Sequence, residues 1–170
     1  MRILITGTTG FVGHKLKASY TDAIAAPSLR NATQDMIKKI VEESEADVVI
    51  HTAAISDIGT CQKDPQSSYF ANVQIPLYLA AACKDRKLIC FSSDQVYSAC
   101  KEEGPYIEEV VKPGNIYAEH KLEMEERVLE LVPSAVMLRA EWMYDYVSPK
   151  PNYFLNVLHA SQQVSFSSRQ

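Results

Sequence analysis

The sequence alternates apolar runs of strand length with longer segments whose apolar residues recur at helical spacing. The run 47–52 is continuous enough to be a strand buried on both faces. The segment 32–45 repeats pairs of apolar residues one turn apart, which predicts a helix capped by Asn31 or Thr33. In chain order we expect strands at 2–6, 22–26, 47–52, 88–92 and 135–139, and helices at 11–19, 32–45, 65–85 (kinked or restarted near Pro76), 115–131 and 152–163.

This alternation constrains the fold more than any other feature. Strands that are separated by helices form a parallel sheet, and right-handed crossovers leave helices on both of its faces. The prediction is therefore an α/β fold with a doubly wound, mostly parallel sheet. A length of 170 residues suits one such domain, 1–170.

Charge and composition exclude several classes of partner. A formal net charge of -4 argues against nucleic acid, whose phosphates favour a basic face. No apolar run approaches the roughly 18 residues that a membrane span needs, and the start of the chain does not read as a signal peptide. The four cysteines form no Cys-x-x-Cys pair, so we expect no metal site and a reducing, cytoplasmic setting.

A glycine-rich turn follows the first expected strand, and a helix starts inside it. The turn reads Gly7-Thr8-Thr9-Gly10-Phe11-Val12-Gly13. Glycine permits a positive φ and lets the backbone approach a pyrophosphate, and a helix N-terminus offers that anion unpaired N–H groups. A strand before the turn and a helix after it make this a Rossmann-type dinucleotide site, with NAD or NADP as the cofactor.

The adenosine end of the cofactor is expected to meet Ser28, Leu29 and Arg30. A dinucleotide fold often places an acid in this region to hold the ribose, and none occurs here. Arg30 is a candidate for contacting a 2′-phosphate, which would favour NADP; a solvated arginine is the alternative.

The catalytic prediction starts from a tyrosine and a lysine four residues apart on a helix. A nearby ammonium favours the phenolate, so such a pair can move a proton to or from a carbonyl oxygen. Three Tyr-x-x-x-Lys pairs occur, but those at Lys101 and Lys150 stand beside loop or proline sequence. Tyr117 and Lys121 alone open an uninterrupted helix, and Ser93 ends the strand at whose edge ligands bind.

With these motifs, the sequence resembles the extended short-chain dehydrogenases/reductases, and its dTDP-4-dehydrorhamnose reductase branch most closely. The resemblance is carried by the glycine turn, by Ser92-Ser93-Asp94-Gln95-Val96-Tyr97 and by Tyr117-Ala118-Glu119-His120-Lys121. Further matching segments are His51-Thr52-Ala53-Ala54, Ala71-Asn72-Val73, Pro113-Gly114-Asn115-Ile116-Tyr117 and Leu138-Arg139-Ala140-Glu141-Trp142.

The resemblance implies a role for each matching residue. Tyr117 would be the proton donor, Lys121 would bind the nicotinamide ribose, and Ser93 would polarise the keto group. Ala53 and Ala54 would line the cofactor, and Asn72 would support the active-site backbone. The residues expected to face the substrate are Ile58, Asp94, Gln95 and Trp142.

The implied function is NAD(P)H-dependent reduction of a nucleotide-linked 4-keto-6-deoxy sugar. Two alternatives stay open: a sugar-nucleotide epimerase or dehydratase, and a non-catalytic NADP-binding regulatory subunit, like that of methionine adenosyltransferase. The resemblance also implies a smaller C-terminal substrate domain, which this sequence does not contain. A homodimer through the helices at 65–85 and 115–131 is a further expectation.

Overall fold

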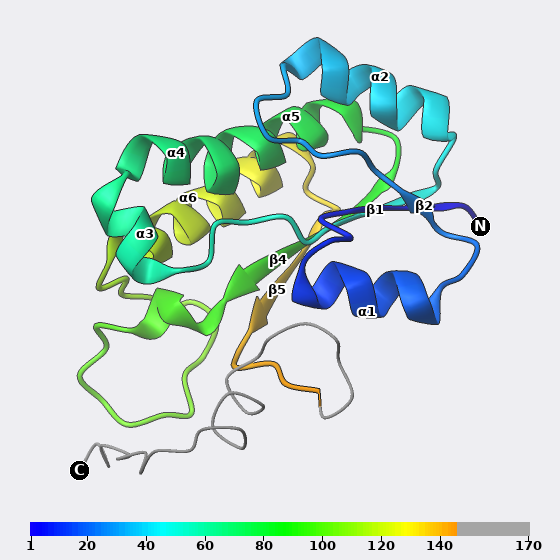
Figure 1. Ribbon diagram of the computed structural model, residues 1–170. Coiled ribbons are helices and arrows are strands. Elements are labelled where there is room, and N and C mark those ends of the chain that lie inside the picture. The colour runs from blue at the N-terminus through cyan, green and yellow to red at the C-terminus, as the bar shows by residue number, and fades with distance from the viewer. Residues whose placement is uncertain (146–170) are drawn as a thin grey trace, which may run out of the picture.

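The computed structural model describes residues 1–145 (Figure 1). The helix expected at 152–163 lies outside the described residues. The strands are β1 (Ile3–Thr6), β2 (Ile24–Ala25), β3 (Val48–His51), β4 (Lys87–Ser93) and β5 (Val136–Ala140). The α-helices are α1 (Phe11–Ser19), α2 (Gln34–Ser44), α3 (Ile58–Lys63), α4 (Pro65–Tyr69), α5 (Ile75–Ala82) and α6 (Ile116–Leu131).

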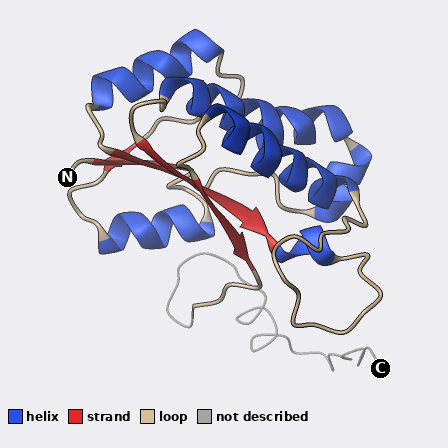
Figure 2. Ribbon diagram, turned by 180° about the vertical axis from the view of Figure 1, so that it is seen from behind, coloured by secondary structure: helices blue, strands red, loops and turns tan. Residues whose placement is uncertain are grey.

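The described strands form one parallel sheet in the order β2-β1-β3-β4-β5. In the views of Figures 1 and 2, α1 lies on one side of the sheet, and α2, α4, α5 and α6 lie on the other. The predicted Rossmann-type architecture is confirmed. β1 has β2 on one side and β3 on the other, so the order in which strands are added to the sheet reverses at β1. In such a sheet a crevice opens at the carboxyl ends of the two strands at the reversal, here β1 and β3.

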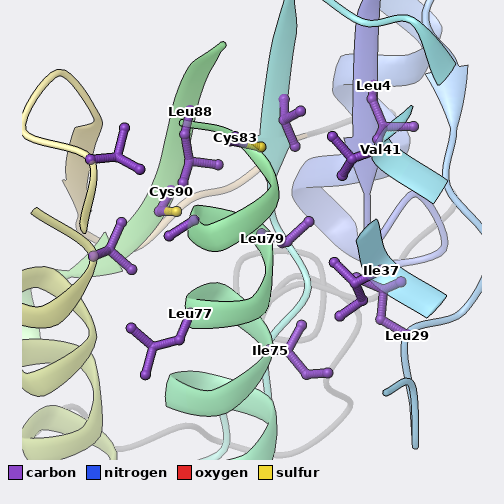
Figure 3. Close-up of a cluster of buried hydrophobic side chains, with 14 of the residues drawn as sticks. Leu4, Leu29, Ile37, Val41, Ile75, Leu77, Leu79, Cys83, Leu88 and Cys90 are labelled. Atoms are coloured by element: carbon purple, nitrogen blue, oxygen red, sulfur yellow. The ribbon is translucent and has the colours of Figure 1, made fainter. Parts of the chain in front are cut away.

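The larger core lies between the sheet and the layer of α2, α5 and α6. Strand residues such as Leu4 and Leu88 face helix residues such as Val41 and Leu79 (Figure 3), and all four are almost inaccessible to solvent. Cys83 and Cys90 are also buried there. Burial raises the pKa of the Cys90 thiol to about 12, so this residue behaves as a small apolar side chain.

The smaller core lies under α1. It consists of Ile3, Ile5, Ala23 and Ile50, with Leu16 of α1 packed against them. In β3, the adjacent residues Val49 and Ile50 belong to opposite cores, which explains the continuous apolar run at 47–52 that predicted a strand buried on both faces.

The helical segment after β3 is more divided than the sequence suggested. Instead of one helix at 65–85, α4 passes into a π-helical turn at Phe70–Gln74, and α5 begins at Ile75. Pro76 stands in the first turn of α5, where a missing N–H costs nothing. The restart predicted near Pro76 is therefore present, directly after the π-helical turn.

No helix within residues 1–145 has the length and apolar character that crossing a membrane requires.

Candidate active site

The glycine turn forms a cradle at the amino end of α1. Gly10 is the N-cap of this helix in extended conformation, and no side chain caps the helix there. The first turn of α1 also carries no acidic residue. The N–H groups at this end therefore remain available, together with the positive end of the helix dipole, for an anion.

Two glycines of the turn are required by close backbone approaches. Gly7 has a φ of +72°, and a Cβ there would lie 2.6 Å from the backbone nitrogen of Ala53. A Cβ on Gly13 would lie 2.3 Å from the carbonyl oxygen of Gly7. The Thr52 hydroxyl donates to the carbonyl of Thr6 at 2.7 Å and ties the ends of β1 and β3 together. The turn is thus packed directly on the segment after β3.

A cavity of about 1010 Å³ extends from this turn along the edge of the sheet. Most of the predicted cofactor-binding residues line it, namely Gly7, Thr9, Gly10, Ser28, Leu29, Arg30, Ala53 and Ala54. Phe11, Val12 and Gly13 lie just beyond it in the first turn of α1. Among the described residues that line the cavity, none is acidic and Arg30 is the single cation. The shape and charge of this cavity suit a dinucleotide with its pyrophosphate on α1.

The predicted catalytic residues meet where β4 ends. Ser93 is the last residue of β4, and Tyr117 and Lys121 lie one turn apart near the start of α6. All three side chains are buried, and Tyr117 shares a hydrogen bond with the side chain of Ser93. The Lys121 ammonium donates to the carbonyl oxygen of Phe91 at 2.5 Å. The structure therefore brings together the three residues that the sequence singled out.

Burial sets the protonation of this group. Desolvation raises the pKa of Tyr117 above its ordinary value, and the hydrogen bond with Ser93 opposes this rise. Desolvation also lowers the pKa of Lys121 to about 8, while the negative charge of Glu125 raises it. Tyr117 thus keeps its proton at neutral pH, as a donor requires.

Asn72 holds the backbone next to the site. Its amide nitrogen donates to the carbonyl of Ile55 at 2.9 Å, and its amide oxygen accepts from the Ile55 N–H at 3.1 Å. The side chain is fully buried in the π-helical turn. This two-point contact fixes the segment that follows Ala53 and Ala54, in agreement with the supporting position that the resemblance implied.

The predicted substrate-facing residues surround the same edge of the sheet. Asp94 and Gln95 open the 3-10 turn Asp94–Tyr97 after β4 and line a second cavity of about 900 Å³. Ile58 begins α3 and is 40 % exposed. Trp142 follows β5 and is 67 % exposed, so it is not a core residue. The structure places all four near or beyond the carboxyl ends of the strands, where Asp94 accepts from the Ser93 hydroxyl at 3.1 Å and Gln95 accepts from the Asn115 amide at 3.4 Å.

Two supporting features were not predicted. Asn115, expected as the first residue of its helix, is the N-cap of α6 and accepts from the Ala118 N–H at 2.9 Å. Asn followed by a helical pattern was the available signal. The second feature is a buried ion pair between Glu125 of α6 and Arg139 of β5, for which sequence spacing gives no signal.

Comparisons with known proteins agree with this geometry. Residues 1–166 match the family model described as the RmlD substrate binding domain. The dTDP-4-dehydrorhamnose reductase of Mycolicibacterium smegmatis is 32 % identical over 152 residues, which cover 84 % of this chain and 46 % of that protein. The chain thus spans about half the length of such curated relatives.

Two solved structures have the same fold and comparable identity. The dTDP-4-dehydrorhamnose reductase of Clostridium acetobutylicum matches with a TM-score of 0.82 at 25 % identity, covering 93 % of this chain and 58 % of that one. The Bacillus anthracis enzyme of the same name, solved in complex with NADP, matches with a TM-score of 0.75 at 25 % identity, covering 84 % of this chain and 54 % of that one.

Proposed function

Because this chain belongs to the RmlD substrate binding domain family, we propose that it is the cofactor-binding part of an NADPH-dependent reductase. Its substrate would be a nucleotide-linked 4-keto-6-deoxy sugar, as the name of the relatives suggests. One observation carries the proposal: Ser93, Tyr117 and Lys121 lie together at the end of β4, on the sheet edge that also bears the glycine cradle.

The cofactor would lie across the crevice between β1 and β3. Its pyrophosphate would rest on the amino end of α1, against Gly7, Gly10 and the residues up to Gly13. Its adenosine would reach Ser28, Leu29 and Arg30. The absence of a carboxylate among the described lining residues favours a 2′-phosphate over a bare ribose hydroxyl, and Arg30 would pair with that phosphate.

The bound cofactor would supply a hydride to the ketone carbon of the substrate. The phenol of Tyr117 would donate its proton to the ketone oxygen as charge develops there. The Ser93 hydroxyl would hydrogen-bond the same oxygen and place it next to Tyr117. Lys121, held by the carbonyl of Phe91, would bring its ammonium to the nicotinamide ribose and stabilise the resulting phenolate.

The substrate would enter from the side of the 3-10 turn that follows Ser93. Asp94 and Gln95 offer a carboxylate and an amide there, groups that suit the hydroxyls of a sugar. Ile58 and Trp142 would bound the opening. The homodimer expected through α4–α6 stays a prediction.

The test combines binding with turnover in the parent chain and in Tyr117→Phe. Calorimetric titration with NADPH should show binding to both proteins, because the variant keeps the cradle. With a dTDP-4-keto-6-deoxy sugar present, the parent should consume NADPH, and the variant should do so about 100-fold more slowly or less. Because this chain spans about half the length of its relatives, binding without consumption would limit the 170-residue chain to cofactor binding; the same result in a protein that also carries the second half of such a relative would replace the reductase by a non-catalytic cofactor-binding module. No binding of NADPH in the parent would overturn the proposal.

A further inference from the structure

A cluster of polar side chains, in which Glu125 and Ser92 are buried and Arg139 and Tyr97 are partly buried, lies behind the catalytic residues. The Glu125 carboxylate of α6 is 4 % exposed and receives both arms of the Arg139 guanidinium, with Nε–Oε1 at 3.0 Å and Nη2–Oε2 at 2.6 Å. The Ser92 hydroxyl donates to the same carboxylate. Arg139 also donates from Nη1 to the Tyr97 hydroxyl at 2.6 Å. The cluster thus joins α6 to β4, to β5 and to the 3-10 turn.

Burying a carboxylate and a guanidinium costs free energy that their attraction does not reliably return. An apolar pair of similar size is often as stable or more stable. Stability alone is therefore a weak reason for Glu125 to occupy this position. Its place on α6 gives a better one, because positions 117, 121 and 125 follow at intervals of four and share one face of the helix.

Three successive residues of β4 bind this face of α6. Ser93 hydrogen-bonds Tyr117, the carbonyl of Phe91 accepts from Lys121, and the hydroxyl of Ser92 donates to Glu125. The last of these contacts is the one farthest along the helix from its N-cap. Because Arg139 donates two hydrogen bonds to Glu125, the distance between α6 and β4 is fixed near Glu125.

The charge of Glu125 also bears on Lys121. The titratable groups that act on Lys121 come from α3 (Cys61), from β4 (Cys90) and from α6 itself (Glu125), and the neutral ring of His51 faces it from β3. The thiol of Cys90, with its pKa raised to about 12, carries no charge near neutrality. Of these groups, Glu125 is the one whose carboxylate can hold Lys121 in its charged form.

We propose that Glu125, anchored by Arg139 and Ser92, is a positioning residue that aligns Lys121 with the end of β4 and keeps its ammonium protonated. The proposal rests on the proposed function for the use made of Lys121. The experiment on Glu125 needs neither cofactor nor substrate, so the proposal for Glu125 and the proposed function can fail separately.

The experiment follows the deprotonation of Lys121 by NMR in the 170-residue chain with ¹³Cε-labelled lysine. Lys121→Arg assigns the resonance. In Glu125→Gln, the titration midpoint of Lys121 should fall by about one pH unit, a tenfold loss of proton affinity, because an opposite charge nearby is removed. A matched control is Glu123→Gln, which removes the same charge from the side of α6 that contacts Tyr69 of α4, where Glu123 pairs with Arg127 at 2.8 Å. The control should leave the midpoint unchanged.

A second variant keeps the proposal testable if Glu125→Gln does not fold. Glu125→Gln combined with Arg139→Met removes both charges, so neither stays buried without a partner. The midpoint should still fall, but by less than in Glu125→Gln, because the positive charge of Arg139 that is removed as well opposes the charge of Glu125. An unchanged Lys121 midpoint in whichever of these two variants folds, or an equal fall in Glu123→Gln, would overturn the proposal.

Discussion

Replacing Gly13 with alanine would place a methyl group inside the glycine turn. The new Cβ would lie 2.3 Å from the carbonyl oxygen of Gly7 and 2.7 Å from the hydroxyl oxygen of Thr52. Non-bonded carbon contacts are favourable at about 3.5 Å or more, so α1 would have to move by roughly 1 Å. Because the obstacle is backbone rather than a flexible side chain, the turn itself must open.

The magnitude follows from two opposing effects. Alanine stabilises a helix interior by about 1 kcal/mol relative to glycine. Overpacking of a closed site costs about 1–3 kcal/mol, and more where backbone must shift. We expect Gly13→Ala to lose about 2 kcal/mol overall. Gly59→Ala is the matched control, because its Cβ on α3 would meet nothing closer than an Asp57 oxygen at 3.5 Å. That variant should gain up to about 1 kcal/mol.

Urea unfolding of the parent and both variants gives their free energies of unfolding, provided that the dependence on urea concentration has the same slope in all three. Titration with NADPH gives the affinities. The two variants should differ by about 3 kcal/mol in stability. Gly13→Ala should also bind NADPH at least tenfold more weakly, since the N–H groups of α1 move away from the phosphate position, whereas Gly59→Ala should bind it as the parent does. Equal stability and equal affinity in the two variants would refute the close-packed cradle.

Three further predictions concern other parts of the chain. Arg30→Ala should weaken NADPH binding about tenfold and leave NADH binding unchanged, because it removes one charged contact with a 2′-phosphate. Calorimetric titration with both nucleotides measures the two affinities. If Arg30 is a solvated arginine, neither affinity will change. Asn115→Ala should lower stability by about 1 kcal/mol through loss of the α6 N-cap, and a melting temperature equal to the parent's would contradict this. Burial lowers the pKa of His51 to about 3, so below pH 6.5 the unfolded chain binds a proton at this residue and the folded chain does not. The free energy of unfolding should therefore fall as the pH drops from 6.5 toward 3, by roughly 1.4 kcal/mol per pH unit. In His51→Asn it should fall less steeply. Parallel pH curves for that variant and the parent would show that His51 is not the cause.

Much of the fold could be read from the sequence because its signals are local. Apolar runs and helical periodicity placed the strands and the longer helices, and Thr33 is indeed the N-cap of α2. α3 was missed because six residues with a glycine among them carry too little periodicity. The π-helical turn at Phe70–Gln74 also has no local signature, since it depends on how the helix packs.

The candidate site divides in the same way. Tyr117 and Lys121 were separable from two competing pairs because only their segment continues as a helix. The Glu125–Arg139 pair was not predictable, because its partners meet only once α6 is packed beside β5. The raised pKa of Tyr117 was not predictable either. Spacing suggested that Lys121 would favour the phenolate, whereas in the folded chain burial raises the pKa of Tyr117.

Nuclear Overhauser effects between the nicotinamide C4 protons of bound NADPH and the ring protons of labelled tyrosines report whether the cofactor reaches Tyr117. Tyr78 also lines the cofactor cavity and provides an internal comparison. We expect a cross-peak to a tyrosine whose signals are absent from the spectrum of Tyr117→Phe. If saturating NADPH gave cross-peaks to Tyr78 alone, and none to Tyr117, the nicotinamide would lie away from the end of β4, and the proposed role of Tyr117 as proton donor would be wrong.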